Sequence, residues 1–399
     1  MSAKICITGY GVICAIGNNA DECFSALKSE KHGVALLKNV SSKFQNNILV
    51  GEVKRSNDEL LQLASLKKIP TNSRGVLLGI IAAKQAVAHA NLSAEELKNT
   101  ALISGTSVGG MDLFEQGYQG VIDANIQNPD YFFSEHDCGN LNAKIASELG
   151  LSGYTTCIST ACSSSANAIL LGARMIKNGI VKRAIVGGSD ALSKFTINGF
   201  HSLGILSEKH TTPFDKDRTG LNLGEGAAYL ILEAEDVCAN KKVLGTVAGW
   251  GNANDAFHQT ASSESGDGSI LSIKKALKTA EISPSEIDYI NTHGTGTGNN
   301  DFAESVAMKT IFGENIPAFN SLKPFTGHTL AACGSIEAVF SLFSINENIL
   351  FPSLNFQTPI EETNLIPVQA LRENIEISTV LSNSFGFGGN CTSLIFTKG

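Results

Sequence analysis

Hydrophobic and polar positions follow two different patterns along this chain. Strand-like runs occur in "KICITGYGVI" (4–13), "RAIVGGSDA" (183–191) and "IDYINTHG" (287–294). A helical period appears elsewhere, with apolar residues at Ala166, Ile169, Leu170, Ala173 and Ile176. Strands that alternate with amphipathic helices predict an α/β protein built in layers.

Two pairs of segments suggest that the chain contains an internal duplication. "KICITGYGVI" at Lys4–Ile13 is similar to "KVLGTVAGWG" at Lys242–Gly251, since both are strand-like and rich in glycine. "GLNLGEGAAYLILE" (220–233) and "GFGGNCTSLIF" (386–396) are both glycine-rich turns that lead into an apolar strand. We therefore predict two similar α/β halves, residues 1–238 and 239–399, although glycine-flanked apolar strands are common enough for coincidence to remain an alternative.

Composition and charge narrow the class of protein. Apolar residues make up 43% and charged residues 17% of the 399 positions, which is typical of a globular chain with a substantial core. The net charge of −8 argues against general nucleic-acid binding, which depends on neutralising phosphates, but allows an acidic partner to dock on a local basic patch. No run approaches 18 uninterrupted apolar residues, so no membrane span is expected.

The start of the chain and its nine cysteines point to one compartment. "MSAKICITGYGVICAIGNN" lacks the charged head, apolar middle and cleavage site of a signal peptide. The cysteines show no C-x-x-C spacing, and an odd, scattered set suits reduced thiols better than a disulfide framework or a zinc site. We expect a cytoplasmic protein without a bound metal.

The run "CISTACSSSANAI" (157–169) places two cysteines where a helix begins. A metal site, a disulfide, a buried hydrophobic residue and a nucleophile are the competing interpretations. Residues 154–160 are strand-like and the helical period starts at Ala166, so Cys162 falls at the strand-to-helix turn. Free N–H groups and the dipole at a helix N-terminus favour a thiolate and can face an oxyanion. We predict that Cys162 is a nucleophile and that Cys157 is a core residue.

Two histidines could manage protons for such a nucleophile. His293 lies in "NTHGTGTGNND" and His328 in "KPFTGHTLAACG", and each follows a predicted strand end, where sites in α/β folds collect. Lys323 lies five residues before His328. A structural role is the alternative for any single histidine.

Taken in order, the patterns "STACSSS", "HGTGT…D..E", "K...GH...A.G..E" and "NSFGFGG" resemble the β-ketoacyl-acyl-carrier-protein synthases of the thiolase superfamily. The resemblance extends from Lys4 to the end of the chain. It implies a thiolase-like, five-layered αβαβα fold made of two similar halves, and it implies no cofactor.

The resemblance also implies a role for each site residue. Cys162 would accept the acyl chain, and His293 and His328 would promote decarboxylation of the malonyl donor. The backbone N–H groups of Cys162 and Phe387 would form the oxyanion hole, while Phe387 would also gate the acyl pocket. Lys323 would hold the hydrogen-bond network. Further support would come from Glu304, Asp301, Thr295 and Thr297.

The implied activity is a decarboxylative Claisen condensation between an acyl thioester and malonyl carrier protein. The pathway would be fatty acid elongation or a related polyene or polyketide route. "GGNC" (388–391) and "HGTGTG" (293–298) depart from the family's frequent "GGTN" and "HGTST", which leaves the pathway open. The alternative is a subunit that determines chain length in a type II heterodimer, but the intact Cys162, His293 and His328 argue against it.

The expected partners are an acyl carrier protein and a second subunit. The resemblance implies a homodimer, with a heterodimer as the alternative, in which residues 105–116 reach toward the partner's acyl pocket. An acidic carrier protein needs a basic patch on this acidic chain. The candidates are Lys67, Lys68, Arg74 and Lys209, and an ordinary solvated charge run is the competing interpretation.

Overall fold

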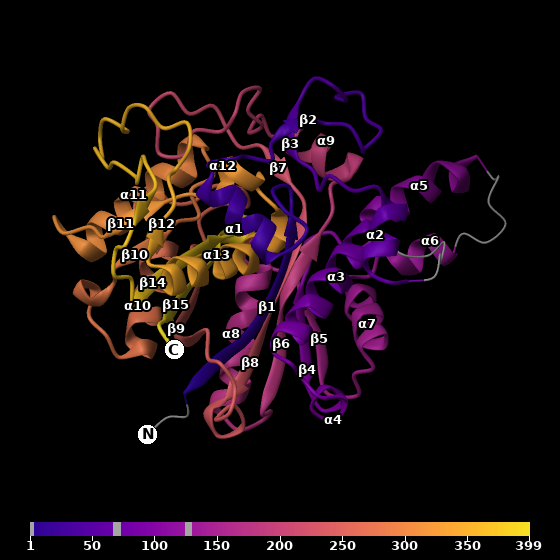
Figure 1. Ribbon diagram of the computed structural model, residues 1–399. Helices are drawn as coiled ribbons and strands as arrows, with labels where there is room; N and C mark the ends of the chain where they lie inside the picture. The colour runs from indigo at the N-terminus through magenta and orange to yellow at the C-terminus, as the bar shows by residue number, and fades with distance from the viewer. Residues whose placement is uncertain (1–3, 67–72, 124–129) are drawn as a thin grey trace.

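A ten-stranded sheet made of two similar halves runs through the molecule (Figure 1). In the computed structural model, which describes residues 4–66, 73–123 and 130–399, the first half has the order β5-β4-β6-β8-β1. The second half has the order β11-β10-β14-β15-β9. Counted along the chain within each half, both orders are 3-2-4-5-1. Two residue pairs between β1 and β9, Cys6 with Thr246 and Ile7 with Gly245, join the halves.

Strand directions repeat in the same way. The first half contains β1 (Ile5–Cys14), β4 (Ala101–Gly105), β5 (Thr155–Ile158), β6 (Arg183–Asp190) and β8 (Gly226–Ala234). The second half contains β9 (Gly245–Asn254), β10 (Tyr289–Asn291), β11 (Ala318–Asn320), β14 (Thr379–Phe385) and β15 (Asn390–Thr397). Strand β4 is parallel to β5 and β6, as β10 is to β11 and β14, whereas β8 and β15 are antiparallel to their neighbours. The predicted duplication is confirmed, because β1 matches β9 and β8 matches β15.

Six helices complete five layers. Helices α3 (Arg74–His89) and α7 (Cys138–Leu149) cover the outer face of the first half-sheet, while α10 (Asp267–Ala280) and α11 (Gly298–Phe312) cover that of the second (Figure 1). Between the half-sheets lie α8 (Ser164–Lys177) and α13 (Cys333–Glu347), which contact each other and strands of both halves. The predicted αβαβα arrangement is thus confirmed. The predicted boundary at 238/239 lies in the segment between β8 and β9.

Most of the remaining α-helices and strands are short. They comprise α1 (Ala20–Lys28), α2 (Asn57–Leu63), α4 (Ala94–Lys98), α5 (Met111–Ile122), α6 (Asp130–Glu135), α9 (Lys194–Ser202), α12 (Lys323–Thr326), β2 (Ala35–Leu36), β3 (Leu49–Gly51), β7 (Leu223–Gly224), β12 (Ile349–Leu350) and β13 (Arg372–Glu373). Within the described ranges, no helix combines the length and the apolar character needed to cross a membrane.

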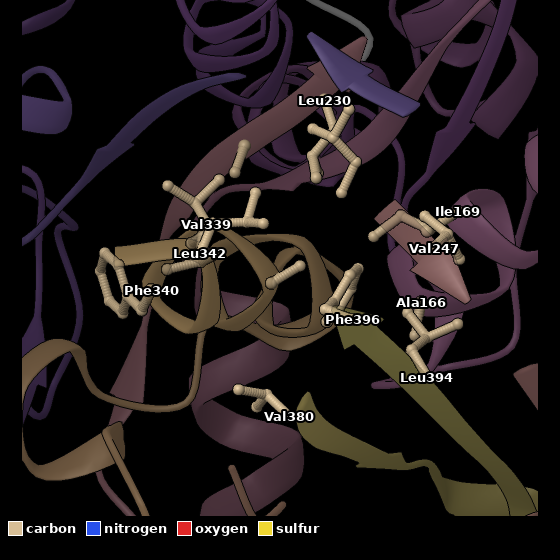
Figure 2. Close-up of a cluster of buried hydrophobic side chains, with 14 of the residues drawn as sticks. Ala166, Ile169, Leu230, Val247, Val339, Phe340, Leu342, Val380, Leu394 and Phe396 are labelled. Carbon is tan, nitrogen blue, oxygen red and sulfur yellow. The ribbon is translucent and has the colours of Figure 1, made fainter. Parts of the chain in front are cut away.

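The central layer is the main hydrophobic core. Figure 2 shows side chains of α13 and α8 packed against strands of both halves; the labelled residues are Ala166, Ile169, Leu230, Val247, Val339, Phe340, Leu342, Val380, Leu394 and Phe396. Helix α13 is buried on all sides, as expected for a helix that is apolar all round. Each large side chain buried here stabilises the fold by roughly 1.5–3 kcal/mol.

The two central helices meet at their N-terminal ends. A Cβ atom on Gly334 would lie 2.9 Å from the Cβ atom of Ala166 and 3.0 Å from its backbone nitrogen, so this approach requires glycine. Cys162 immediately precedes α8, and His328 lies shortly before α13. The packing of these helices therefore brings the predicted nucleophile and one predicted histidine to the same place.

Candidate active site

Cys162 occupies the tight turn between β5 and α8, as predicted. Ala161 has a positive φ of 51°, which lets the chain turn directly into the helix that starts at Ser164. The Cys162 side chain is only 6% exposed. Burial raises the pKa of the Cys162 thiol to about 11, although the charge of Lys323 and the backbone N–H of Phe387 act to lower it. Burial of the thiol therefore opposes the thiolate that the helix N-terminus is expected to favour.

Cys157 differs from its predicted place in the core. It is only partly buried, because β5 is the edge strand of the sheet and leaves one side of that strand uncovered in this chain.

His293 and His328 lie beside Cys162. One ligand atom from each of the three side chains lies within 4.8 Å of the others. The two imidazole rings are nearly perpendicular, at 88°, with their centroids 5.4 Å apart. His293 follows strand β10, whereas His328 follows the short helix α12. The three residues singled out from separate parts of the sequence thus form one cluster.

Both imidazoles are neutral. Burial, reinforced by the charge of Lys323, lowers the pKa of His328 to about 3. The same two causes, followed by His328, hold the pKa of His293 well below its ordinary value. The backbone N–H of Leu330 donates to Nδ1 of His328 at 3.0 Å, so the proton of this neutral ring resides on Nε2. His328 therefore offers a donor, not an acceptor, at Nε2.

Lys323 contacts the backbone of His293. Its side chain is 1% exposed, and its Nζ donates to the carbonyl oxygen of His293 and to Oε1 of Glu337 at 2.6 Å. Burial acts to lower the pKa of Lys323, but attraction and hydrogen bonding to Glu337 outweigh it and keep the ammonium charged. Sequence reasoning did not assign a role to Glu337. An acidic residue within the apolar run of α13 was the available signal.

Two buried carboxyl groups hold the loop that carries His293. Glu304 accepts the backbone N–H groups of His293 and Gly294, each at 2.9 Å. Asp301 accepts the backbone N–H groups of Thr295 at 2.9 Å and Phe214 at 2.8 Å. Burial raises the pKa of Glu304 to about 7, although these N–H groups oppose the shift. Both carboxyl groups therefore hold the backbone of the loop that carries His293.

A cavity of about 160 Å³ opens onto the cluster. Its lining includes Cys162, Phe200, His293, Thr295, Thr297, His328 and Phe387. The hydroxyl groups of Thr295 and Thr297 lie 2.9 Å apart. Phe387 is partly exposed and stacks on Phe200 with ring centroids 5.6 Å apart. The backbone N–H of Phe387 is directed at the Cys162 sulfur, which suits the predicted oxyanion hole.

The predicted docking residues have different outcomes. Lys67 and Lys68 lie outside the described residues, and Lys209 is exposed. The prediction for Arg74 is wrong, because its side chain is 7% exposed and its guanidinium binds the carboxylate of Glu225 at 2.7 Å. Arg74 is the first residue of the buried helix α3, and its charge is paired with Glu225 inside the first half.

Several known proteins are similar to this chain in sequence and in fold. The family descriptions "Beta-ketoacyl synthase, N-terminal domain" and "Beta-ketoacyl synthase, C-terminal domain" match residues 2–237 and 244–357. The 3-oxoacyl-[acyl-carrier-protein] synthase 2 of Synechocystis is 32% identical, with 99% of this chain and 98% of that protein covered. The protein of the same name from Vibrio cholerae is 31% identical, with 99% of each chain covered.

Solved structures agree with this assignment. The ishigamide ketosynthase/chain length factor has a TM-score of 0.94 at 28% identity, with both chains fully covered. The ketosynthase ApeO from Xenorhabdus doucetiae, solved with its chain length factor ApeC, has a TM-score of 0.86 at 32% identity, with 100% of this chain and 98% of that chain covered. The chain therefore belongs to the β-ketoacyl synthases, the condensing enzymes of the thiolase superfamily.

Proposed function

We propose that this enzyme extends an acyl chain held on Cys162 with a malonyl unit delivered by an acyl carrier protein. The observation that carries the proposal is the buried cluster of one thiol and two neutral imidazoles. A thiol forms a thioester that stays reactive toward a carbanion. The names of the 3-oxoacyl-[acyl-carrier-protein] synthases support the carrier-linked substrate.

In the loading half-reaction, the Cys162 sulfur attacks the carbonyl carbon of the acyl thioester. Negative charge develops on the carbonyl oxygen, where the N–H groups of Cys162 and Phe387 stabilise it. The bond to the carrier's thiol breaks, and the thiol proton of Cys162 ends on that leaving sulfur. The high pKa of Cys162 means that deprotonation accompanies attack, because the resting thiol holds its proton.

In the condensing half-reaction, the malonyl carboxylate leaves as carbon dioxide. Its electron pair moves toward the thioester carbonyl oxygen, which accepts hydrogen bonds from His328 Nε2 and from the ring of His293. Neutral donors stabilise the enolate without protonating the carbon that must react. That carbon attacks the acyl group, and the bond between this group and the Cys162 sulfur breaks. The released Cys162 thiolate then takes up one proton from solvent water.

The lining of the cavity supports further roles. Thr295 and Thr297 offer hydroxyl groups to the carrier's pantetheine arm, and Phe387 gates the entrance. We place carrier docking near Lys67, Lys68 and Lys209. We also place the reaction in the cytoplasm, because the nine free cysteines suit a reducing compartment.

Assembly is a separate proposal. Strand β5 lies at one edge of the sheet, and Tyr154 just before it is 50% exposed, so this edge offers backbone groups to a second subunit. We propose a homodimer across this edge. A heterodimer is the second candidate, since the ishigamide and ApeO structures contain chain length factors. Because this chain retains Cys162, we expect it to be the catalytic subunit of such a pair.

The proposal is tested by incubating the protein with acyl carrier proteins that bear chains of different length and saturation. Intact-protein mass spectrometry with peptide mapping would locate the acyl group. We expect acylation at Cys162, followed by chain extension when malonyl carrier protein is added. Acylation at another residue, or none with any carrier, would contradict the proposal. Comparison of extension rates across the panel distinguishes a fatty acid from a polyene or polyketide substrate.

A further inference from the structure

Four side chains lie within hydrogen-bond distance of the amide oxygen of Asn390, and the fourth of them, Thr392, is the most distant at 3.5 Å. The Oδ1 atom of Asn390 lies 2.8 Å from the hydroxyl of Ser163, 2.9 Å from Nδ2 of Asn167 and 2.9 Å from Nδ2 of Asn252. Ser163 directly follows Cys162 and precedes α8, Asn167 lies in the first turn of α8, and Asn252 belongs to β9. The segment that carries Phe387 is thus connected through this one oxygen atom to α8, the helix that follows Cys162, and to strand β9 of the second half.

Neighbouring contacts fix the orientation of the Asn167 amide. Nδ2 of Asn167 also donates to the hydroxyl of Thr160 at 2.9 Å, and its Oδ1 accepts from the hydroxyl of Thr392 at 2.8 Å. Both ends of the Asn167 amide are therefore occupied, so Asn167 presents an N–H and not an oxygen to Asn390. These hydrogen bonds connect α8, β9 and β15.

The loop that carries Phe387 is pressed against the turn that carries Cys162. A Cβ atom on Gly386 would lie 2.7 Å from the carbonyl oxygen of Thr160 and 3.2 Å from the backbone nitrogen of Cys162. The backbone N–H of Gly386 donates to the carbonyl oxygen of Asn390 at 2.8 Å, which closes the loop on Asn390. The position of Asn390 thereby sets where the Phe387 N–H lies relative to that of Cys162.

We propose that Asn390 is a positioning residue that sets the spacing of the oxyanion hole through its ties to Ser163, Asn167 and Asn252. It occupies the third position of "GGNC", where the family often has "GGTN". The inference rests on the proposed function, which assigns the oxyanion hole to the N–H groups of Cys162 and Phe387.

This role predicts unequal effects on the two half-reactions. Donors of an oxyanion hole must lie about 2.7–3.1 Å from the developing oxyanion, so a loosened loop impairs acyl transfer to Cys162. Malonyl decarboxylation depends on His293 and His328, whose neighbours Lys323, Glu304 and Leu330 are outside the network. A loss of general stability would lower both rates together.

The test is Asn390→Ala in the full-length enzyme, with acyl transfer to Cys162 and carbon dioxide release from malonyl carrier protein measured separately. We expect acyl transfer to fall about tenfold to a hundredfold, less than the loss of a whole oxyanion donor, and decarboxylation to stay within about twofold. Asn346→Ala is the matched control, because its Nδ2 bonds the carbonyl oxygens of Leu244 and Leu342 away from the site. Both rates should stay parental in this control.

A double-mutant cycle with Asn167→Ala tests the tie itself. The double variant should transfer acyl groups no more slowly than Asn390→Ala alone, because the shared contact is already lost. Should Asn390→Ala fail to fold, Asn252→Ala removes one donor from the same oxygen and must show the same unequal loss. An unchanged acyl-transfer rate, parallel loss of both rates, or additive losses in the cycle would each overturn the inference.

Failure of the proposed function has a different signature. It would appear as acylation of the parent enzyme at a residue other than Cys162, which would overturn this inference as well. Failure of the inference alone would leave acylation at Cys162 intact, with an unchanged ratio of the two half-reaction rates in Asn390→Ala.

Discussion

The backbone N–H of Leu330 lies 3.0 Å from Nδ1 of His328 and donates a hydrogen bond to it. Leu330 has a positive φ of 54°, a conformation that is costly for a branched side chain, and the result is a ring with its proton held on Nε2. The proposed condensing reaction uses a donor at that atom.

Replacing His328 tests whether this donor matters. His328→Ala should lower carbon dioxide release about 10²–10³-fold, the usual loss for one positioned donor. His328→Asn should retain more activity, because its amide N–H can still donate. His258→Ala, in an exposed loop, is the control. Equal losses in the Ala and Asn variants would show that His328 acts by some means other than donation.

Removal of Lys323 should affect both stability and the histidines. Lys323→Ala leaves Glu337 as an uncompensated buried charge, and such losses cost roughly 3–5 kcal/mol of the free energy of unfolding. Lys323→Met combined with Glu337→Leu should recover much of that stability, as measured by urea unfolding, without recovering activity. Parental activity in the folded double variant would remove Lys323 from the reaction.

The histidines also make stability depend on pH. The folded-state pKa of His328 is about 3, below its unfolded value of 6.5, so the unfolded chain binds one more proton between these values. Stability from this residue is present above pH 6.5 and is lost as the pH falls toward 3. Glu304, with a raised pKa, acts in the opposite direction, but it is common to the parent and the variant.

We therefore compare the parent with His328→Gln. Between pH 6.5 and 3 the parent's free energy of unfolding should fall more steeply than the variant's, by up to about 1.4 kcal/mol per pH unit. Urea unfolding at several pH values measures this difference. Identical slopes would mean that His328 has the same pKa in the folded and unfolded states.

Charge reversal separates docking from folding. Lys209→Glu, and the pair Lys67→Glu and Lys68→Glu, should raise KM for the carrier-linked substrate, more at low salt, because screening weakens such contacts at high salt. Arg74→Leu should instead lower the free energy of unfolding, since Glu225 would lose its buried partner. An unchanged KM in the lysine variants would remove this surface from the account.

Local patterns in the sequence predicted much of the fold and the cluster of reactive side chains. Cys162 follows a strand and precedes a helical period, and the repeated glycine-flanked strands predicted two halves. Contacts between distant segments were not visible in the same way. The pairing of Lys323 with Glu337 and the burial of Arg74 against Glu225 depend on how helices pack. The direction of the pKa shift of Cys162 could not be predicted either, because it depends mainly on how deeply the folded chain buries the thiol.

The most direct test of the central claim measures both half-reactions in Cys162→Ala and His293→Ala, beside the melting temperature of each variant. In folded Cys162→Ala, acyl transfer should vanish while carbon dioxide release from malonyl carrier protein persists. In folded His293→Ala, acyl transfer should persist while carbon dioxide release falls about 10²–10³-fold. Acylation of folded Cys162→Ala, or a parental rate of carbon dioxide release in folded His293→Ala, would contradict the mechanism.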